Sequence, residues 1–203
     1  MEEPRAQVVL LCGPSGSGKT HIAARSGLPV FRLDDFYRDG DDPALPISAE
    51  LGIPDWDDPR SWRADDAVAA LDALCREGRT TVPTYDISLS ATTGEAQMEL
   101  GGAPAVVAEG VFAAEIVEHL RDRGLLADAV VLHRAPWKNF VRRFARDLAE
   151  RRKPPATLWR RGRILMGVER DVVQSACDRG CRAVEAAELA ALLRRLRDGA
   201  GVG

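Results

Sequence analysis

The stretch of sequence that decides the fold is Gly13-Pro-Ser-Gly-Ser-Gly-Lys19-Thr20, close to the amino terminus. It matches the pattern GxxxxGK[ST], whose glycines let the backbone wrap closely enough for N–H groups to point at phosphate oxygens. The apolar run at 7–12 predicts a buried parallel strand, and the residues after Gly18 predict a helix ending near Ser26-Gly27. The sequence therefore predicts a P-loop, a phosphate-binding loop between a buried strand and a helix.

Each position of this loop has a predicted task in binding ATP or GTP. Lys19 is expected to reach the β- and γ-phosphates as a point charge, and the Thr20 hydroxyl is expected to ligate Mg²⁺. A glycine-rich strand-to-helix turn without a ligand is the alternative. The residues predicted to bind the nucleotide are Gly13, Ser15, Gly16, Ser17, Gly18, Lys19 and Thr20.

Length and composition are typical of one globular domain spanning residues 1–203. No apolar run approaches the ~18 residues that a membrane span needs, so we expect no membrane partner and a cytoplasmic protein. The net charge of -3 argues against a protein that mainly coats nucleic acid. The four cysteines have no metal-type spacing of paired clusters, which favours free thiols over a metal site.

Alternating apolar patterns along the chain predict an α/β class with a mostly parallel central sheet and helices on both faces. A hairpin excursion is expected at 87–102, turning at Thr93-Gly94. Further strands are predicted at 30–33, 80–85, 105–108 and 129–132, and further helices at 64–77, 111–123, 137–151, 157–175 and 185–197.

Two carboxylates follow predicted strands directly, at the sheet edge where open α/β folds bind ligands. Asp34, followed by Asp35, ends the second predicted strand and is the candidate base that accepts a hydroxyl proton in phosphoryl transfer. Glu109 ends a buried strand and is a candidate Mg²⁺ ligand, directly or through water. The alternatives are a turn cap for the aspartates and an ordinary helix start for Glu109.

A basic segment lies in the second half of the chain, with nine Lys or Arg against two acids from Arg142 to Arg163. One interpretation is a helical lid at about 137–163 that closes over the triphosphate with arginines. A solvated charged face and a nucleic-acid groove are the alternatives.

Taken together, these residues resemble the uridine kinase family, within the wider group that includes phosphoribulokinase and bacterial pantothenate kinase. The similarity covers most of the chain and follows the family's order. It rests on GPSGSGKT at 13–20, LDDFYRD at 33–39, DWDDP at 55–59, VPTYD at 82–86, VAEGVF at 107–112 and RRFARDLAERR at 142–152.

The resemblance implies roles for individual residues. Asp34 would accept the proton of a ribose 5'-hydroxyl, Asp57 would bind the ribose 2'- and 3'-hydroxyls, and Tyr85 would lie by the base. Tyr37 is expected beside the substrate as part of the D-x-F-Y pattern, and Glu109 near the metal. The lid arginines correspond to Arg143, Arg146 and Arg151, with Arg146 also expected to contact substrate.

Two positions depart from the family pattern. A base-reading histidine that some members place after Tyr-Asp has no counterpart, and Ser90 stands nearby. Lys153 stands where the lid usually carries an arginine, and a lysine cannot fork onto phosphate in the same way.

The sequence therefore predicts an ATP- and Mg²⁺-dependent kinase that phosphorylates the 5'-hydroxyl of a small-molecule nucleoside, uridine or cytidine, in pyrimidine salvage. A kinase for another small hydroxyl metabolite, such as a sugar or a vitamin precursor, is the enzyme alternative. A nucleotide-binding regulatory or nucleic-acid-associated module is the alternative from another class, although a nucleic-acid partner is not favoured. The sequence leaves open whether the protein forms an oligomer.

Overall fold

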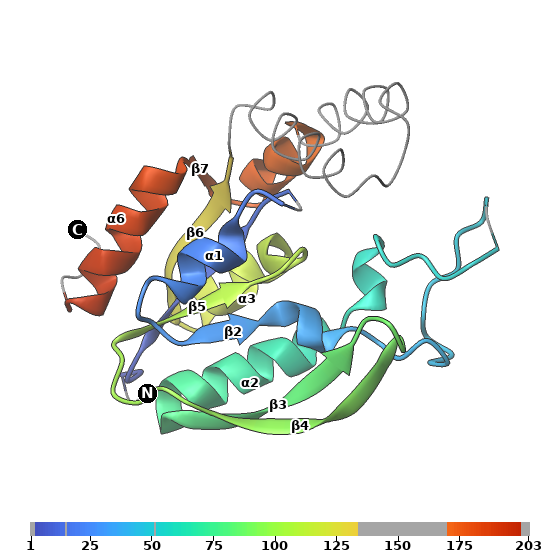
Figure 1. The fold of residues 1–203 in the computed structure, drawn as a ribbon, viewed down its shortest axis with the longest axis horizontal. Helices are drawn as coiled ribbons and strands as arrows, with labels where there is room; N and C mark the ends of the chain where they lie inside the picture. The colour runs from blue at the N-terminus through green and yellow to red at the C-terminus, as the bar shows by residue number, and fades with distance from the viewer. Residues whose placement is uncertain (1–2, 15, 51, 134–169, 200–203) are drawn as a thin grey trace, which may run out of the picture.

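The structure is a computed structural model that describes residues 3–14, 16–50, 52–133 and 170–199 (Figure 1). A central sheet is flanked by helices, and a separate pair of strands lies beyond α2. The strands are β1 (Gln7–Cys12), β2 (Val30–Arg32), β3 (Arg79–Asp86), β4 (Ala91–Glu99), β5 (Ala105–Glu109), β6 (Leu126–Leu132) and β7 (Arg182–Val184). The helices are α1 (Lys19–Ala24), α2 (Ala64–Glu77), α3 (Val117–Asp122) and α6 (Ala186–Arg197), with 3-10 turns η1 (Leu33–Phe36), η2 (Pro59–Ser61) and η3 (Ala113–Ile116).

The central sheet has five strands in the order β2-β5-β1-β6-β7, and every neighbouring pair is parallel. β5 is buried along its whole length, as expected for a strand covered on both faces. The predicted α/β class with a mostly parallel sheet is confirmed.

Side chains of β1 alternate between two hydrophobic cores because successive residues of a strand point to opposite faces. Val8, Leu10 and Cys12 belong to the core under α2 and α3, whereas Val9 and Leu11 belong to the core under α1 and α6. Helices therefore cover both faces of the sheet, as the sequence predicts.

Helix α2 shows how the local sequence sets its own boundaries. Asp65 and Asp66 lie in its first turn, where carboxylates favour the positive end of the helix. The helix ends at Glu77 and is capped by Gly78, whose φ of 86° is a left-handed conformation that glycine adopts without a steric penalty. Its apolar residues, among them Leu71, recur at helical spacing and are buried against the sheet, so the bounds predicted at 64–77 are confirmed.

The prediction for residues 80–102 is wrong in two respects. β3 does not join the parallel sheet; it pairs antiparallel with β4 in a two-stranded sheet that packs on α2. Thr93 and Gly94 lie inside β4, and the chain turns instead at 87–90. The Asp86 carboxylate stabilises that turn, since it accepts hydrogen bonds from the backbone N–H and the hydroxyl of Ser88.

Smaller differences occur where helices and strands are short. The helix predicted at 111–123 divides into η3 and the six residues of α3. The helix predicted to end near 175 extends to 178 in its described part, and β7 follows it as a short edge strand that the sequence did not indicate. The helix predicted at 137–151 and the whole lid at 137–163 lie outside the described residues.

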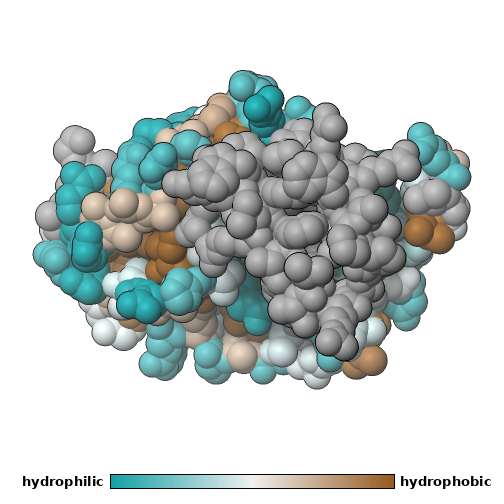
Figure 2. Space-filling model, turned by 45° about the horizontal axis from the view of Figure 1, so that its top comes forward, coloured by the Kyte–Doolittle hydropathy of each residue, from teal (hydrophilic) through white to brown (hydrophobic). Residues whose placement is uncertain are grey.

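Two exposed apolar side chains lie in the loop between η1 and η2. Ile47 and Ile53 expose 59% and 55% of their surface. Figure 2 shows a brown, hydrophobic side chain at the right-hand end, on the side where Figure 1 places this loop.

Among the helices of the described part, none is long and apolar enough to cross a membrane.

Replacement of Leu71 tests the packing of α2 on the sheet. Leu71→Ala leaves a cavity at a fully buried position, so we expect the free energy of unfolding to fall by about 2–5 kcal/mol. The control Glu77→Ala changes an exposed position of the same helix and should alter it by less than about 0.5 kcal/mol. Equal denaturant midpoints for the two variants would contradict the described packing.

Candidate functional site

The predicted site residues meet at the carboxyl edge of the central sheet. β1 continues into the P-loop, β2 into Asp34, and β5 ends at Glu109 between these two strands. The strand register places Glu109 opposite Leu11 of β1 and opposite Arg32 of β2. The P-loop and the Asp34 turn therefore lie on either side of one carboxylate.

Glycines in the P-loop have backbone conformations that other residues rarely adopt. Gly13, Gly16 and Gly18 have φ values of 139°, 78° and 95°. At Gly13 an added Cβ would lie 2.7 Å from the carbonyl oxygen of Leu132, so the loop leaves β1 in close contact with β6. These backbone conformations and the close contact at Gly13 explain why the loop needs glycine at these positions. Ser15, also predicted to bind the nucleotide, lies outside the described residues.

Lys19 folds back over the loop that precedes it. Its Nζ donates to the carbonyl oxygens of Gly13 and Pro14, at 2.7 and 3.2 Å. Burial lowers the pKa of Lys19, whereas the negative charges of Glu109 and Asp34 raise it. The ammonium is thus held at the mouth of the loop, within electrostatic reach of both carboxylates.

Thr20 and Glu109 are in direct contact across the loop. The Thr20 hydroxyl donates a hydrogen bond to Oε2 of Glu109 at 3.1 Å. Only 8% of the surface of Glu109 is exposed. A hydroxyl and a carboxylate are oxygen ligands of the kind that Mg²⁺ prefers. Ser17, in the same loop, is fully buried, and its hydroxyl has no hydrogen-bond partner among the described residues. These residues fit a bound Mg²⁺-nucleotide, whose phosphate oxygens would be acceptors for such a hydroxyl.

Asp34 reaches back from η1 to the end of β5. Its Oδ1 accepts a hydrogen bond from the backbone N–H of Val111 at 3.1 Å. Gly110 makes this contact possible, because a Cβ there would lie 2.7 Å from Cβ of Leu33 and 2.8 Å from Oδ1 of Asp34. One carboxylate oxygen is thus held by the backbone, and Oδ2 has no such bond among the described residues.

Next to Asp34, aromatic rings form a cluster around Tyr37. Its ring centroid lies 5.9 Å from that of Trp56, 5.9 Å from that of Tyr85 and 5.8 Å from that of Phe112. Burial raises the pKa of the Tyr37 hydroxyl, and the nearby charges of Asp34 and Asp57 raise it further. We call these four residues the aromatic cluster.

The structure brings most predicted substrate residues to this cluster. Tyr37 and Tyr85 belong to it, and the exposed Asp57 follows Trp56 directly. The Tyr85 hydroxyl is already used, since it donates to the carbonyl oxygen of Arg38 at 3.1 Å. That bond gives Tyr85 a structural role in holding the loop after η1.

The loop after η1 is also tied to the β3–β4 sheet. Asp39 Oδ1 accepts hydrogen bonds from the backbone N–H and the hydroxyl of Thr92, at 2.7 and 2.9 Å. Gly40 N–H donates to the carbonyl oxygen of Ser90 at 2.7 Å. The loop that follows Asp34 is therefore anchored to the β3–β4 sheet.

Sequence reasoning missed three contributors to the site. Gly110 has no predicted role within the stretch VAEGVF, yet its missing Cβ is what admits Asp34. Phe112 and Trp56 were quoted within motifs but not selected, and only their packing on Tyr37 reveals them. The predicted lid arginines Arg143, Arg146 and Arg151 lie outside the described residues.

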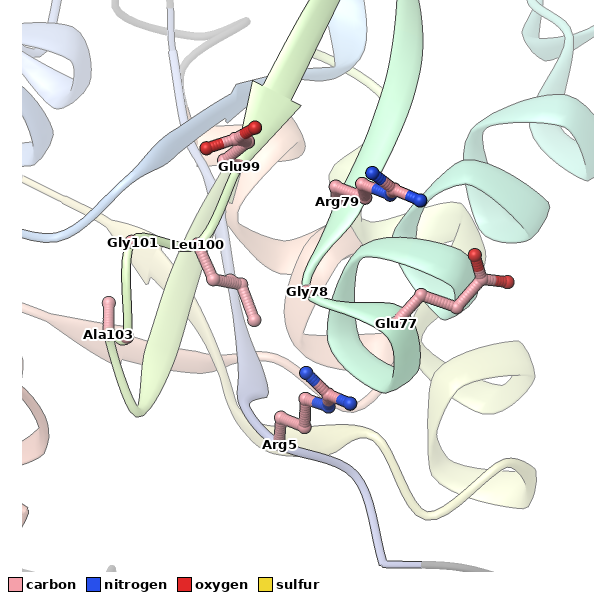
Figure 3. A pocket seen from close by; sticks show the side chains of 9 residues that line it. Arg5, Glu77, Gly78, Arg79, Glu99, Leu100, Gly101 and Ala103 are labelled. Carbon is pink, nitrogen blue, oxygen red and sulfur yellow. The ribbon is translucent and has the colours of Figure 1, made fainter.

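Two other pockets lie away from this edge. One, of about 250 Å³, lies near the amino ends of β1 and β5, on the opposite edge of the sheet, with Arg5 and Arg79 at its rim (Figure 3). The other, of about 440 Å³, lies between α2 and the β3–β4 sheet. Neither contains a residue predicted for catalysis or nucleotide binding.

Alanine at Gly110 tests the close approach of Asp34. The Gly110→Ala methyl would collide with Asp34 and Leu33. If Asp34 has its predicted role as the base, ATP-dependent turnover should fall by about 10²-fold, the loss typical of a misplaced reacting group. The control Gly94→Ala adds a methyl where no atom lies within 4 Å and should keep turnover. Unchanged turnover in Gly110→Ala would show that activity does not depend on the close contact between Asp34 and the backbone at Gly110.

Comparison with known proteins identifies the fold. No protein-family profile matches the sequence, and no curated protein matches it significantly. Among solved structures, the chain is similar to a candidate fructose transport system kinase from Silicibacter sp. TM1040, with 17% identity, a TM-score of 0.55, and coverage of 91% of this chain and 90% of that chain.

Two further solved structures resemble the chain with lower TM-scores. A candidate uridine kinase from Bacillus stearothermophilus is 18% identical, with a TM-score of 0.46 and coverage of 70% of this chain and 78% of that chain. Phosphoribulokinase from Rhodobacter spheroides is 15% identical, with a TM-score of 0.42 and coverage of 71% and 57%. From the sheet order, the phosphate-binding loop and the first similarity, the chain has the α/β fold of P-loop kinases.

Proposed function

We propose that this protein is a kinase that transfers the γ-phosphoryl group of ATP to a hydroxyl of a small metabolite, the 5'-hydroxyl of a pyrimidine ribonucleoside. One observation carries the proposal. A phosphate-binding loop with its lysine, a buried hydroxyl-carboxylate pair and a second carboxylate meet at one sheet edge, as Thr20, Glu109 and Asp34 show. A loop that only binds nucleotide has no need of Asp34.

The proposed step needs little covalent help from the protein. Asp34 accepts the proton of the acceptor hydroxyl through Oδ2, and the acceptor oxygen attacks the γ-phosphorus. The bond to the β–γ bridging oxygen breaks, and that oxygen leaves on ADP with its electron pair. Lys19, released from the carbonyl oxygens of its own loop, binds the phosphate oxygens as their charge shifts.

Mg²⁺ would be held by Thr20 and Glu109, where it would neutralise charge on the β- and γ-phosphates. Lys19, Asp34 and Glu109 together carry one positive and two negative charges in a partly buried place. Buried charges are stable when they are paired. A divalent cation would pair with the two carboxylates, and the phosphates of a nucleotide would pair with Lys19. We assign further charge stabilisation to the arginines Arg143, Arg146 and Arg151.

The aromatic cluster supports a ribonucleoside as acceptor. Tyr37 lies close enough to Asp34 for the carboxylate charge to raise its pKa, and Trp56 packs on Tyr37. Both rings are half-buried, and aromatic faces stack on nucleobases. Asp57, whose charge is felt by Tyr37, would accept hydrogen bonds from the two ribose hydroxyls. The ribose would then lie between the base, at the aromatic cluster, and its 5'-hydroxyl, at Asp34.

A sugar or polyol is the second candidate acceptor. It is favoured because the Tyr85 hydroxyl is already hydrogen-bonded within the protein. That hydroxyl is bonded to Arg38, and the ring of Tyr85 packs on Tyr37, so Tyr85 contributes structure to the loop. Asp34 and Asp57 could then both bind hydroxyls of an acceptor that has no base. The two candidates share the phosphate site and differ only in the acceptor.

The first test is ADP release from Mg²⁺-ATP against ribonucleosides, deoxyribonucleosides, sugars and polyols. Uridine or cytidine should stimulate turnover, and Asp34→Asn should lower kcat by about 10²–10⁴-fold because it removes the proton acceptor. Asp39→Asn is the matched control, since Asp39 binds Thr92 and not the reacting centre.

Each result selects one candidate. Stimulation by sugars or polyols alone would replace the nucleoside with the second candidate. Tight ATP binding without any acceptor-dependent turnover would reject the kinase and favour a nucleotide-binding module. Equal turnover in the Asp34→Asn and native proteins would reject Asp34 as the base.

Replacement of Glu109 tests the proposed metal position. Glu109→Gln keeps the size of the side chain and removes its charge, so half-maximal turnover should need about 10–100-fold more Mg²⁺. Glu99→Gln, at the exposed end of β4, is the control and should leave the Mg²⁺ requirement unchanged. A normal Mg²⁺ dependence of Glu109→Gln would exclude Glu109 as a ligand.

A further inference from the structure

Two cysteines far apart in sequence meet at the base of the P-loop. Cys12 ends β1 directly before Gly13, and Cys181 precedes β7. Their sulfur atoms lie 3.7 Å apart although 169 positions separate the residues along the chain. Both thiols are free, and 2% of Cys12 and 6% of Cys181 are exposed.

We propose that Cys12 and Cys181 are a reversible oxidation site, whose disulfide weakens nucleotide binding. The inference goes beyond the proposed kinase reaction and does not depend on the acceptor. A disulfide needs a sulfur-sulfur distance of about 2.05 Å, so the two sulfurs must approach each other by about 1.7 Å from the present 3.7 Å.

The surroundings of Cys181 let its sulfur move and react. It follows Gly180, which has a φ of 91°, in the turn between residues 170–178 and β7. The Cys12 thiol donates a hydrogen bond to the Cys181 sulfur and lowers the pKa of Cys181, and Arg121 and Arg179 lower it further. Burial and the nearby Asp128 act in the opposite direction. Cys181 is therefore the thiol that reacts first, since the thiolate is the nucleophile.

The oxidant that we name is hydrogen peroxide, which is small enough for a nearly buried sulfur. The Cys181 thiolate attacks one peroxide oxygen, the O–O bond breaks, and a sulfenic acid and hydroxide form. The Cys12 sulfur then attacks the Cys181 sulfur, the S–O bond breaks, and the hydroxyl leaves with the Cys12 proton as water. The first hydroxide takes up the proton lost by Cys181, so two thiols and one peroxide give one disulfide and two waters.

The effect on nucleotide binding follows from the position of Cys12. Gly13 packs so closely on Leu132 that a Cβ would lie 2.7 Å from its carbonyl oxygen. β1 is also paired on both sides, with β5 and β6. Cys181 takes up part of the approach, but β1 has no free space for the part that falls on Cys12, which therefore changes the direction in which the loop leaves β1.

Peptide mapping of the oxidised protein tests the site. Reduced protein is treated with hydrogen peroxide, its remaining thiols are alkylated, and it is digested with trypsin. Cleavage at Arg179 separates Cys177 from Cys181, and cleavage at Lys19 releases the Cys12 peptide. We expect one cross-linked peptide that joins Cys12 to Cys181 and that dithiothreitol reverses.

A binding measurement on the same samples tests the consequence. The Kd for ATP, measured without an acceptor, should rise about five-fold or more on oxidation and return on reduction. Cys181→Ser should form no cross-link and show no change in Kd with peroxide. Cys177→Ser, which alters the half-buried cysteine four positions before Cys181, is the matched control and should respond as the native protein does.

Three results would overturn the proposal. They are the absence of any Cys12–Cys181 cross-link, a disulfide between Cys177 and Cys181 in its place, and a Cys12–Cys181 cross-link that leaves the Kd unchanged. Cys181→Ala replaces the serine variant if a far-UV spectrum shows that Cys181→Ser is not folded. Because ATP binding is measured directly, a failure of the kinase proposal would not be mistaken for a failure of this one.

Discussion

The parallel pairing of β1 with β5 is the constraint on which the site depends. This register sets Leu11 opposite Glu109, so the end of β5 comes to lie beside the P-loop that follows β1. A slip of one residue would turn every side chain of a strand to the other face of the sheet. Glu109 would then lose the Thr20 hydroxyl, and the buried carboxylate would be left without that hydrogen bond.

Two glycines turn this register into close contacts. At Gly13 and at Gly110 an added Cβ would lie 2.7 Å from a neighbouring atom, Leu132 O in the first case and Leu33 Cβ in the second. The first contact lets the loop leave β1 against β6. The second lets the Asp34 carboxylate accept a hydrogen bond from the backbone beyond β5, so that Asp34, the buried Glu109 and the P-loop meet at one edge.

Electrostatics explain why such an arrangement suits a bound polyanion and its cation. Burial lowers the pKa of Lys19 while Glu109 and Asp34 raise it, so the protein holds a cation between two carboxylates at a site that is partly closed to water. The P-loop itself supplies acceptors for the Lys19 ammonium, the carbonyl oxygens of Gly13 and Pro14. Phosphate oxygens would compete for the same ammonium, and charge-assisted hydrogen bonds to them would be stronger than the bonds to carbonyl groups.

Local sequence patterns determined much of the architecture. The P-loop, β1, the bounds of α2 and the parallel strand β5 followed from glycine spacing, apolar runs and helix ends, because these signals act between residues close in the chain. Asp34 and Glu109 were predicted as site residues because strand ends of an α/β sheet share one edge. Their proposed roles await the experiments on activity.

The tertiary structure decided the features that depend on residues far apart in the chain. β3 pairs with β4 away from the central sheet, the aromatic cluster closes around Tyr37, and Cys12 meets Cys181. Periodicity tells which face of an element is apolar but not which distant element will cover it. The chain's local chemistry thus specified the phosphate loop, whereas the packing of distant segments specified what surrounds it.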